Sequence, residues 1–308
     1  MEHAADGILL IDKEKGETSH GVVKKVRSVF RRGKGVKVGH AGTLDPFATG
    51  LLIILLGEGT KLSRFIMAGE KIYLATVELG VETDTLDPTG QVIATRDVPD
   101  LSPEYVREKA SRFIGKIQQV PPVYSAVRYK GRRAYQLARN GRPVELRKRD
   151  VIVHSLRILG MDLPRITARV RCSSGTYIRS LAADLGRDLG PGGHLKSLRR
   201  LKSGPFEVDD ALPSSEIAAE ARERSLTGRV IPMSEAVPQM EEVRVHGDLA
   251  ARIRNGYQPI WEELNIGPDF SDGWVKLVNG HRLVAVMKVA KGNNIGYGKV
   301  KIERVFSE

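Results

Sequence analysis

The sequence has almost no cysteine and no long apolar segment. Its one cysteine, Cys172, can form no disulfide within the chain and leaves no zinc site built from several thiolates. Because Cys172 ends a run of alternating apolar residues, we expect a small core residue rather than a nucleophile. No apolar stretch is long enough to cross a bilayer, and the N-terminus lacks the charged-then-apolar pattern of a signal peptide. We therefore expect a cytoplasmic protein without a membrane partner.

Acidic residues are few relative to basic ones, 37 against 49, which gives a net charge of +12 and a pI of about 9.8. Such an excess favours a polyanionic partner, because cationic surfaces attract phosphate backbones. Charge alone does not choose between a nucleic acid, an acidic membrane and a basic protein without either partner. The 308 residues, 41% of them hydrophobic, are enough for one large domain and a small one.

One polar stretch, residues 38–50, lies between a basic amphipathic segment at 19–32 and the apolar run 51–56. Its glycines, threonines and proline disfavour a helix, whereas the apolar run is typical of a buried strand. The stretch contains His40 and Asp45. An aspartate before a proline is usually a turn former, but a loop docked on buried structure can also hold a carboxylate nucleophile.

The remaining periodicity predicts alternating strands and helices. Strands are expected at 7–11 and 71–79, and two neighbouring strands at 151–172, broken near Pro164. Helices are expected at 19–32 with Ser19 as N-cap, at 59–67, at 101–115 with Ser102 as N-cap, from about 178 towards Gly190, and at 213–224. Beyond Pro238 the pattern changes to a small unit of strands and one helix, with a hairpin turn at Asn279-Gly280.

A basic segment follows the predicted helix at 101–115. Residues 128–149 contain nine lysines or arginines and one acid, Glu145, with Tyr129 and Tyr135 interleaved. Basic residues mixed with aromatic rings suit RNA, because charges follow the phosphates and rings stack on bases. A solvated loop and helix face is the alternative. The candidate RNA contacts here are Arg128, Lys130, Arg132 and Arg133.

Three motifs, in this order, resemble those of the TruB family, the bacterial tRNA pseudouridine-55 synthases. They are Gly39-His-Ala-Gly-Thr-Leu-Asp-Pro46 with Ala48-Thr-Gly50, then Lys71-Ile-Tyr73, then Gly175-Thr-Tyr-Ile-Arg179. The resemblance extends over almost the whole chain. A fourth family motif, Lys-Pro-x-Gly, is changed, because the chain has Lys13-Glu14-Lys15-Gly16. The turn at Glu14 is therefore expected to be less rigid than in the family.

The resemblance implies roles for three catalytic residues. Asp45 would be the nucleophile, Tyr73 would stack on the target base and take part in proton transfer, and Arg179 would pair with Asp45. Such a pairing makes physical sense, since a guanidinium lowers the pKa of a buried carboxyl and fixes its orientation. Without the motif, Tyr73 would be read as a core aromatic and Arg179 as a surface arginine.

The resemblance also implies substrate-binding residues. His40 would fill the space that the extruded base leaves, Asp87 would lie near the bound nucleoside, and Leu198 would line the pocket. Without the motif, Asp87 is a turn former and Leu198 a core residue. The other substrate-binding candidates from the matched motifs are Lys13, Gly42, Thr43 and Tyr177.

The fold implied by the family is α+β: a mixed, mainly antiparallel sheet flanked by helices, the pseudouridine synthase fold, followed by a small PUA-like β-barrel. We expect a catalytic domain at 1–238 and an RNA-binding domain at 239–308. The implied reaction isomerises uridine 55 in the T-arm loop of tRNA to pseudouridine. It requires no cofactor and no metal. We expect a monomer that acts on tRNA with no obligate protein partner.

Two alternatives belong to other functional classes. The chain is compatible with a non-catalytic tRNA-binding or tRNA-folding factor, although the intact set of Asp45, Tyr73 and Arg179 argues against one. It is also compatible with a guide-RNA-dependent synthase of the dyskerin-like type, which shares these motifs. The long basic stretch at 128–149 favours direct binding of tRNA over guidance by a second RNA.

Overall fold

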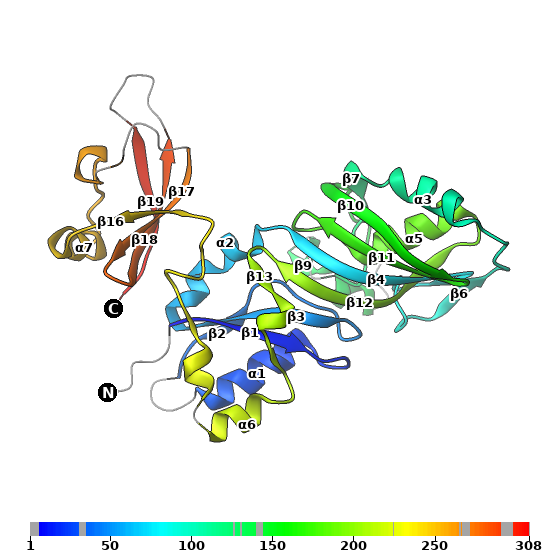
Figure 1. The fold of residues 1–308 in the computed structure, drawn as a ribbon, viewed down its shortest axis with the longest axis horizontal. Helices are drawn as coiled ribbons and strands as arrows, with labels where there is room; N and C mark the ends of the chain where they lie inside the picture. The colour runs from blue at the N-terminus through cyan, green and yellow to red at the C-terminus, as the bar shows by residue number, and fades with distance from the viewer. Residues whose placement is uncertain are drawn as a thin grey trace.

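The computed structural model describes residues 6–30, 35–125, 127–129, 131–139, 144–223, 225–264, 266, 272–290 and 298–307. Within this part of the chain, an 11-stranded sheet dominates, and a 4-stranded sheet forms near the C-terminus. Two strand pairs, β5–β6 (Val81–Thr83, Val92–Thr95) and β8–β9 (Arg128–Tyr129, Arg132–Arg133), lie outside both sheets. Figure 1 shows the long sheet running through the larger part of the molecule and the small sheet standing to one side.

The large sheet has the strand order β14-β1-β3-β12-β4-β11-β10-β7, with β2, β13 and β15 attached to β3, β12 and β1. Within this sheet, β1–β14 and β3–β12 are the only described pairs that are parallel, so the expected mixed, mainly antiparallel sheet is confirmed. The eight strands of this order are, in turn, Leu212–Pro213, Gly7–Lys13, Thr49–Leu56, Gly193–Ser203, Lys71–Leu79, Arg165–Cys172, Arg149–Asp162 and Gly115–Gln119. The attached strands are β2 (Val38–His40), β13 (Phe206–Glu207) and β15 (Ile231–Pro232).

The helices are short; α1, α3 and α5 pack on one face of the large sheet, and α7 packs on the small C-terminal sheet. They are α1 (Ser19–Val29), α2 (Ser63–Met67) after the 3-10 turn η1 (Gly57–Leu62), α3 (Pro103–Ser111), α4 (Ala134–Arg139), α5 (Ile178–Leu189), α6 (Ile217–Arg222) and α7 (Gly247–Arg254). None of these helices is long and apolar enough to cross a membrane. The expected N-cap Ser102 is confirmed, since its hydroxyl accepts from the amide of Tyr105.

Two helix ends differ from the sequence-based expectation. Thr18, not Ser19, caps α1 by accepting from the amide of Gly21. The hydroxyl of Ser19 instead forms hydrogen bonds with the backbone of Leu44. Helix α3 ends at Ser111, and Gly115, with a φ of 100°, begins strand β7 instead of ending the helix.

The main core lies between the large sheet and helices α1, α3 and α5. The alternating residues of β4, namely Tyr73, Ala75, Val77 and Leu79, all face it. Cys172 is fully buried in the same core, as expected. Strand β3 is buried on both faces, which explains its unbroken apolar sequence.

The C-terminal sheet has the order β16-β17-β18-β19 (Glu241–Arg244, Gly273–Asn279, Arg282–Ala290, Lys299–Val305) and packs with α7 around its own core. The hairpin turn expected at Asn279-Gly280 joins β17 to β18. This arrangement is consistent with a PUA-like module. Val286 and Phe306 also pack in one cluster with Ile53 and Leu55 of β3, so the small sheet shares a hydrophobic core with the large one.

Candidate active site

A cleft of about 580 Å³ opens where the loop after β2 meets β4, α2 and the start of α5. Its volume is in the range of sites that bind small molecules or single nucleotides. Five separate segments of the chain contribute its walls, so no single motif builds it. The lining residues are Gly42, Thr43, Leu44, Asp45, Arg64, Met67, Ala68, Lys71, Tyr73, Ser125, Ser173, Ser174, Gly175, Thr176, Tyr177, Ile178, Arg179, Leu198 and Arg200.

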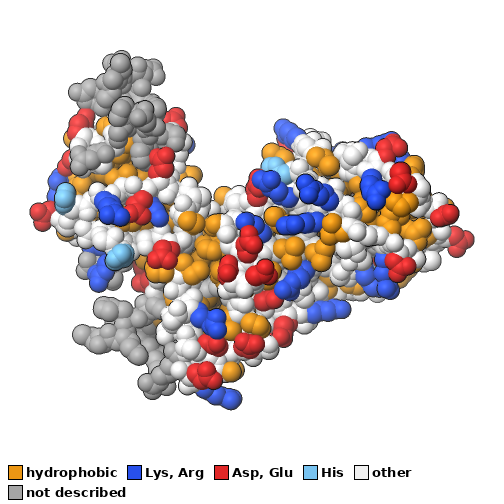
Figure 2. Space-filling view, viewed as in Figure 1, with side chains coloured by type: hydrophobic (Ala, Val, Ile, Leu, Met, Phe, Trp, Pro, Cys, Tyr) orange, Lys and Arg blue, Asp and Glu red, His pale blue; other side chains and the backbone are white. Residues whose placement is uncertain are grey.

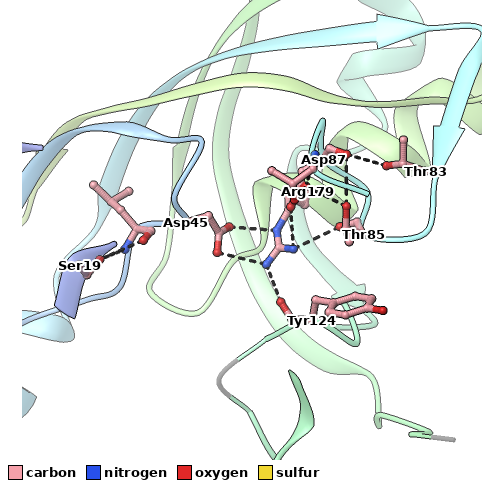
Figure 3. Close-up of polar contacts among 9 residues, drawn as sticks. Ser19, Asp45, Thr83, Thr85, Asp87, Tyr124 and Arg179 are labelled. Atoms are coloured by element: carbon pink, nitrogen blue, oxygen red, sulfur yellow. Dashed lines mark hydrogen bonds and ion pairs between the residues drawn. The ribbon is translucent and has the colours of Figure 1, made fainter. Parts of the chain in front are cut away.

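The central feature of the cleft is one guanidinium between two carboxylates (Figure 3). Nε of Arg179 lies 3.0 Å from Oδ2 of Asp45, and Nη2 lies 3.4 Å from Oδ1. On its other side, Nη1 of Arg179 lies 3.0 Å from Oδ2 of Asp87. The three residues are 134 and 92 positions apart in sequence, so only the tertiary fold brings them together.

Two backbone carbonyls also fix the orientation of the Arg179 guanidinium. Nη1 donates to the carbonyl of Thr85 at 3.2 Å, and Nη2 donates to that of Tyr124 at 2.9 Å. The side chain of Arg179 is only 6% exposed, so these contacts satisfy a buried cation whose donors would otherwise be left unpaired. Arg179 sits in the first turn of α5, a helix whose other buried residues pack on β4 and β12.

The two carboxylates differ in access to the cleft. The side chain of Asp45 is 32% exposed, whereas that of Asp87 is 4% exposed. The second oxygen of Asp87 is occupied by the hydroxyls of Thr85 and Thr89 and by the amide of Thr89. Asp45 is therefore the carboxylate that can meet a substrate, and Asp87 holds Arg179 from behind.

Burial raises the pKa of the Asp45 carboxyl above its ordinary value. The guanidinium of Arg179 and the ammonium of Lys13 oppose that rise, and the nearby charge of Asp87 adds to it. Arg179 thus lowers the pKa of Asp45 as expected, but burial outweighs this effect and the net pKa is raised. A carboxylate that is costly to ionise inside the cleft is also a more basic, more reactive group once ionised.

The loop that carries Asp45 is held by side chains from distant elements. The hydroxyl of Ser19 donates to the carbonyl of Leu44 at 2.9 Å and accepts from the Leu44 amide at 2.8 Å. Arg200, 2% exposed, donates to the carbonyls of Gly42 at 3.0 Å and Leu51 at 2.7 Å. No sequence pattern indicated either role, because Ser19 and Arg200 acquire these contacts only where the loop packs on α1 and β12.

Gly50 is the position where the loop requires glycine. Its φ is +101°, and a Cβ there would lie 2.3 Å from the carbonyl oxygen of Arg200. A side chain would push β3 away from β12 at their parallel contact. Since Arg200 also holds Gly42, such a shift would reach the loop that carries Asp45.

Lys13, which was expected to bind substrate, lies outside the cleft wall, and its role in binding stays a prediction. Its side chain is fully buried and is not part of the cleft wall. Nζ donates to the carbonyls of Glu14 and Glu17, both at 2.9 Å, and lies 3.5 Å from the carbonyl of Pro46. Burial lowers the pKa of this ammonium to about 8. Lys13 therefore supports the Asp45 loop from below.

Glu14, which replaces the proline of the family motif, anchors its turn. Its amide donates to the hydroxyl of Ser214 at 3.1 Å, a hydrogen bond that proline cannot make. Its carboxylate accepts from Ser215 at 2.6 Å. The turn is thus tied to a segment 200 residues away, contrary to the expectation of a looser turn.

The other substrate-binding candidates divide into two groups. Leu198 and Tyr177 line the cleft with Gly42 and Thr43, and Gln119 holds the backbone of Tyr177 through hydrogen bonds of 3.1 and 3.3 Å. His40 is half-buried on β2, in register with Ile54, and is not part of the cleft wall. Its expected role in an opened RNA loop stays a prediction.

Tyr73 lies in the cleft on β4, in register with Arg200 of β12. It is 9% exposed, with its ring between the cleft and the main core. Burial raises the pKa of its phenol, an effect that Arg200 opposes. The phenol is therefore neutral near pH 7, which suits stacking on a base.

The basic segment at 128–149 is described only in part. Lys130 and the side chains of Arg128 and Arg133 lie outside the described residues, and Arg132 is exposed next to them. Elsewhere, many basic side chains are paired: on the sheet face opposite the main core, Glu78 binds Arg165 and Lys196, and Glu70 binds Arg171. Figure 2 likewise shows basic and acidic side chains intermixed on the face in view.

Solved structures with the same fold were found by comparison. The chain aligns with a protein in the "Crystal Structure of a Cbf5-Nop10-Gar1 Complex" at a TM-score of 0.75 and 25% identity, covering 99% of this chain and 86% of that one. It also aligns with one in the archaeal box H/ACA sRNP Nop10-Cbf5 complex at a TM-score of 0.73 and 24% identity, covering 99% and 87%. The architecture is the pseudouridine synthase fold.

Two family models match consecutive parts of the chain. "TruB family pseudouridylate synthase (N terminal domain)" matches residues 27–178, and "tRNA pseudouridylate synthase B C-terminal domain" matches 179–238. Proteins named tRNA pseudouridine synthase B are 43% identical in Geobacter sulfurreducens, over 85% of both chains, and 41% identical in Syntrophus aciditrophicus, over 98% of this chain and 99% of the relative. This chain belongs to the TruB family of pseudouridylate synthases.

Proposed function

We propose that this protein isomerises uridine 55 in the T-arm loop of tRNA to pseudouridine, with Asp45 as the nucleophile. The observation that carries the proposal is the ion pair of Asp45 and Arg179 inside the cleft, in a member of a pseudouridylate synthase family. The relatives named tRNA pseudouridine synthase B supply the substrate class.

The reaction conserves atoms and electrons. The N-glycosidic bond from N1 of uracil to the ribose breaks, and a bond from C5 to the same ribose carbon forms. C5 loses one proton and N1 gains one, so no oxidant or reductant is consumed. A single carboxylate that forms a temporary covalent bond to the nucleoside is sufficient, as in carboxylate-based glycoside chemistry.

Arg179 and Tyr73 have separate tasks in this proposal. Arg179 keeps both oxygens of Asp45 oriented and compensates its charge. Tyr73 stacks on the extruded uracil and, as in the family, takes part in proton transfer. Its buried neutral phenol supports the stacking role directly.

The base must leave its stack before Asp45 can reach it. Extrusion costs a few kcal/mol, which contacts inside the cleft and along the RNA backbone must offset. Leu198 and Tyr177 offer an apolar wall and a fixed backbone for the base. His40 is proposed to hold the opened RNA loop, and Arg128, Lys130, Arg132 and Arg133 to contact its phosphates.

The proposal assigns residues 1–238 to the catalytic domain and 239–308 to an RNA-binding domain. The change from the large sheet to the small one between Pro232 and Glu241 supports this division. Action on tRNA goes with a cytoplasmic location. We propose that no obligate protein partner is needed; the complexes with Nop10 and Gar1 are properties of the Cbf5 structures.

The purified protein, incubated alone with an unmodified tRNA transcript, tests the proposal. Pseudouridine should form at position 55, located by chemical labelling and primer extension, and a transcript with cytidine at 55 should give none. Binding without conversion would support the non-catalytic tRNA-binding factor. Absence of conversion unless a second RNA and partner proteins are added would support the guide-dependent enzyme.

A further inference from the structure

Ser125 is a buried polar residue in the cleft wall that the proposed mechanism does not use. The residue is 5% exposed, and its hydroxyl oxygen has no hydrogen-bond partner among the described residues. A buried hydroxyl without a partner destabilises the folded protein, so most such groups are paired. In a cleft wall, such a hydroxyl is available to a partner that arrives with the substrate.

The segment that carries Ser125 is fixed to the start of α5. Gln119 exchanges two hydrogen bonds with the backbone of Tyr177, and the hydroxyl of Ser180 donates to the carbonyl of Val120 at 2.8 Å. Tyr124, the neighbour of Ser125, accepts from Arg179 at 2.9 Å (Figure 3). Ser125 is therefore held next to the ion pair of Asp45 and Arg179.

The cationic side chains of the cleft are already engaged. Arg200 donates to two backbone carbonyls, and Lys71 donates to the carbonyls of Met67 and Gly69. Arg179 is occupied by two carboxylates and two carbonyls. By contrast, the Ser125 hydroxyl retains its full capacity of one donor and two acceptor sites.

We propose that Ser125 is a substrate-binding residue whose hydroxyl forms a hydrogen bond to the extruded uridine. This inference rests on the proposed function. Uracil offers two carbonyl acceptors and one imide donor, and ribose adds a 2′-hydroxyl; a serine hydroxyl can pair with any of them by rotation. Because that rotation suits donors and acceptors alike, the contact positions the nucleoside rather than selecting the base.

The chain offers a matched control. Ser203 is 1% exposed, its hydroxyl also lacks a partner among the described residues, and it does not line the cleft. The two substitutions Ser125→Ala and Ser203→Ala therefore remove the same group from equally buried places. They differ in whether the hydroxyl borders the cleft.

The test measures the single-turnover rate constant and the affinity for a T-arm stem-loop, together with the melting temperature of each variant. Ser125→Ala should lower the ratio of rate constant to dissociation constant by about 3- to 10-fold, the effect of one neutral hydrogen bond, without lowering the melting temperature. Ser203→Ala should leave that ratio within about twofold of wild type.

Repeating the assay with 2′-deoxyuridine at the target position identifies the partner atom. Loss of the Ser125→Ala effect on that RNA assigns the contact to the 2′-hydroxyl, and persistence assigns it to the base. An unchanged ratio for Ser125→Ala on normal RNA, or equal losses in both serine variants, would overturn the inference. A wild-type protein that converts no uridine would instead refute the proposed function.

Discussion

Two tetrapeptides of identical sequence lie on opposite sides of one guanidinium. Thr43-Leu-Asp-Pro46 and Thr85-Leu-Asp-Pro88 both direct their aspartate to Arg179, at 3.0 Å in each case. Yet Asp45 is 32% exposed to the cleft, and Asp87 is 4% exposed. Identical local sequence therefore yields one carboxylate that can meet a substrate and one that only supports its partner.

The leucines explain part of the difference. Leu44 is buried in the main core and its backbone is fixed by Ser19, which holds Asp45 over the cleft. Leu86 has a φ of 61°, a left-handed conformation that is strained for a leucine. That turn folds the hydroxyls of Thr85 and Thr89 onto Asp87 and closes it off. The environment, not the tetrapeptide, assigns the role.

Among the variants that test the two aspartates, Asp45→Asn should cause the largest loss of turnover. An amide keeps the shape but cannot act as a nucleophile, so turnover should fall by at least about 10³-fold. Affinity for a T-arm stem-loop should change little, since the phosphate contacts remain. Measurable conversion at a tenth of the wild-type rate would remove Asp45 from the nucleophile role.

Arg179→Lys should cause the second-largest loss of turnover. A lysine keeps the charge but loses the planar fork that spans Asp45, Asp87 and two carbonyls, so we expect kcat to fall by roughly 10²-fold. Stopped-flow binding should show affinity within about threefold of wild type. Equal losses in binding and turnover would mean that Arg179 serves as an RNA contact.

Asp87→Asn tests the supporting carboxylate. Removal of one charge from a buried, hydrogen-bonded pair should cost about 1–3 kcal/mol of unfolding free energy, measured by chemical denaturation. Turnover should fall by about tenfold, much less than for Asp45→Asn, because Arg179 keeps its carbonyl partners. If both asparagine variants lose activity equally, the distinction between the two carboxylates is wrong.

The smallest expected effect is a shift in the pH dependence of turnover between the wild type and Asp87→Asn. The proposed mechanism needs ionised Asp45, so it predicts that the rate falls as pH drops through a midpoint above 3.8, the ordinary aspartate value. Because the charge of Asp87 raises the pKa of Asp45, Asp87→Asn should move that midpoint to lower pH. The same shift affects stability. Because the pKa of Asp45 is raised in the folded protein, this group contributes stability at low pH that is lost as the pH rises through its folded-state pKa. A single-turnover pH series on both proteins measures the shift; a midpoint that moves upward would contradict this account.

Periodicity was sufficient for much of the fold. The alternation in β4, the apolar run of β3 and the capping pattern at Ser102 each correspond to the element that was predicted. The errors fall where a residue is used by a distant segment: the Ser19 hydroxyl binds the backbone of Leu44 rather than capping its own helix, and Gly115 begins a strand that pairs with β10. Local propensity carries no information about such partners.

The sequence by itself determined the residue types of the site, the order of its motifs and the faces that must be buried, because these follow from local chemistry and spacing. Only the tertiary structure decided that Lys13 supports the loop from below, that Glu14 is tied to Ser214, and that Asp87 lies behind Arg179. The physical reason is that burial and charge compensation depend on contacts between residues 33 to 200 positions apart in the sequence, which no local pattern records.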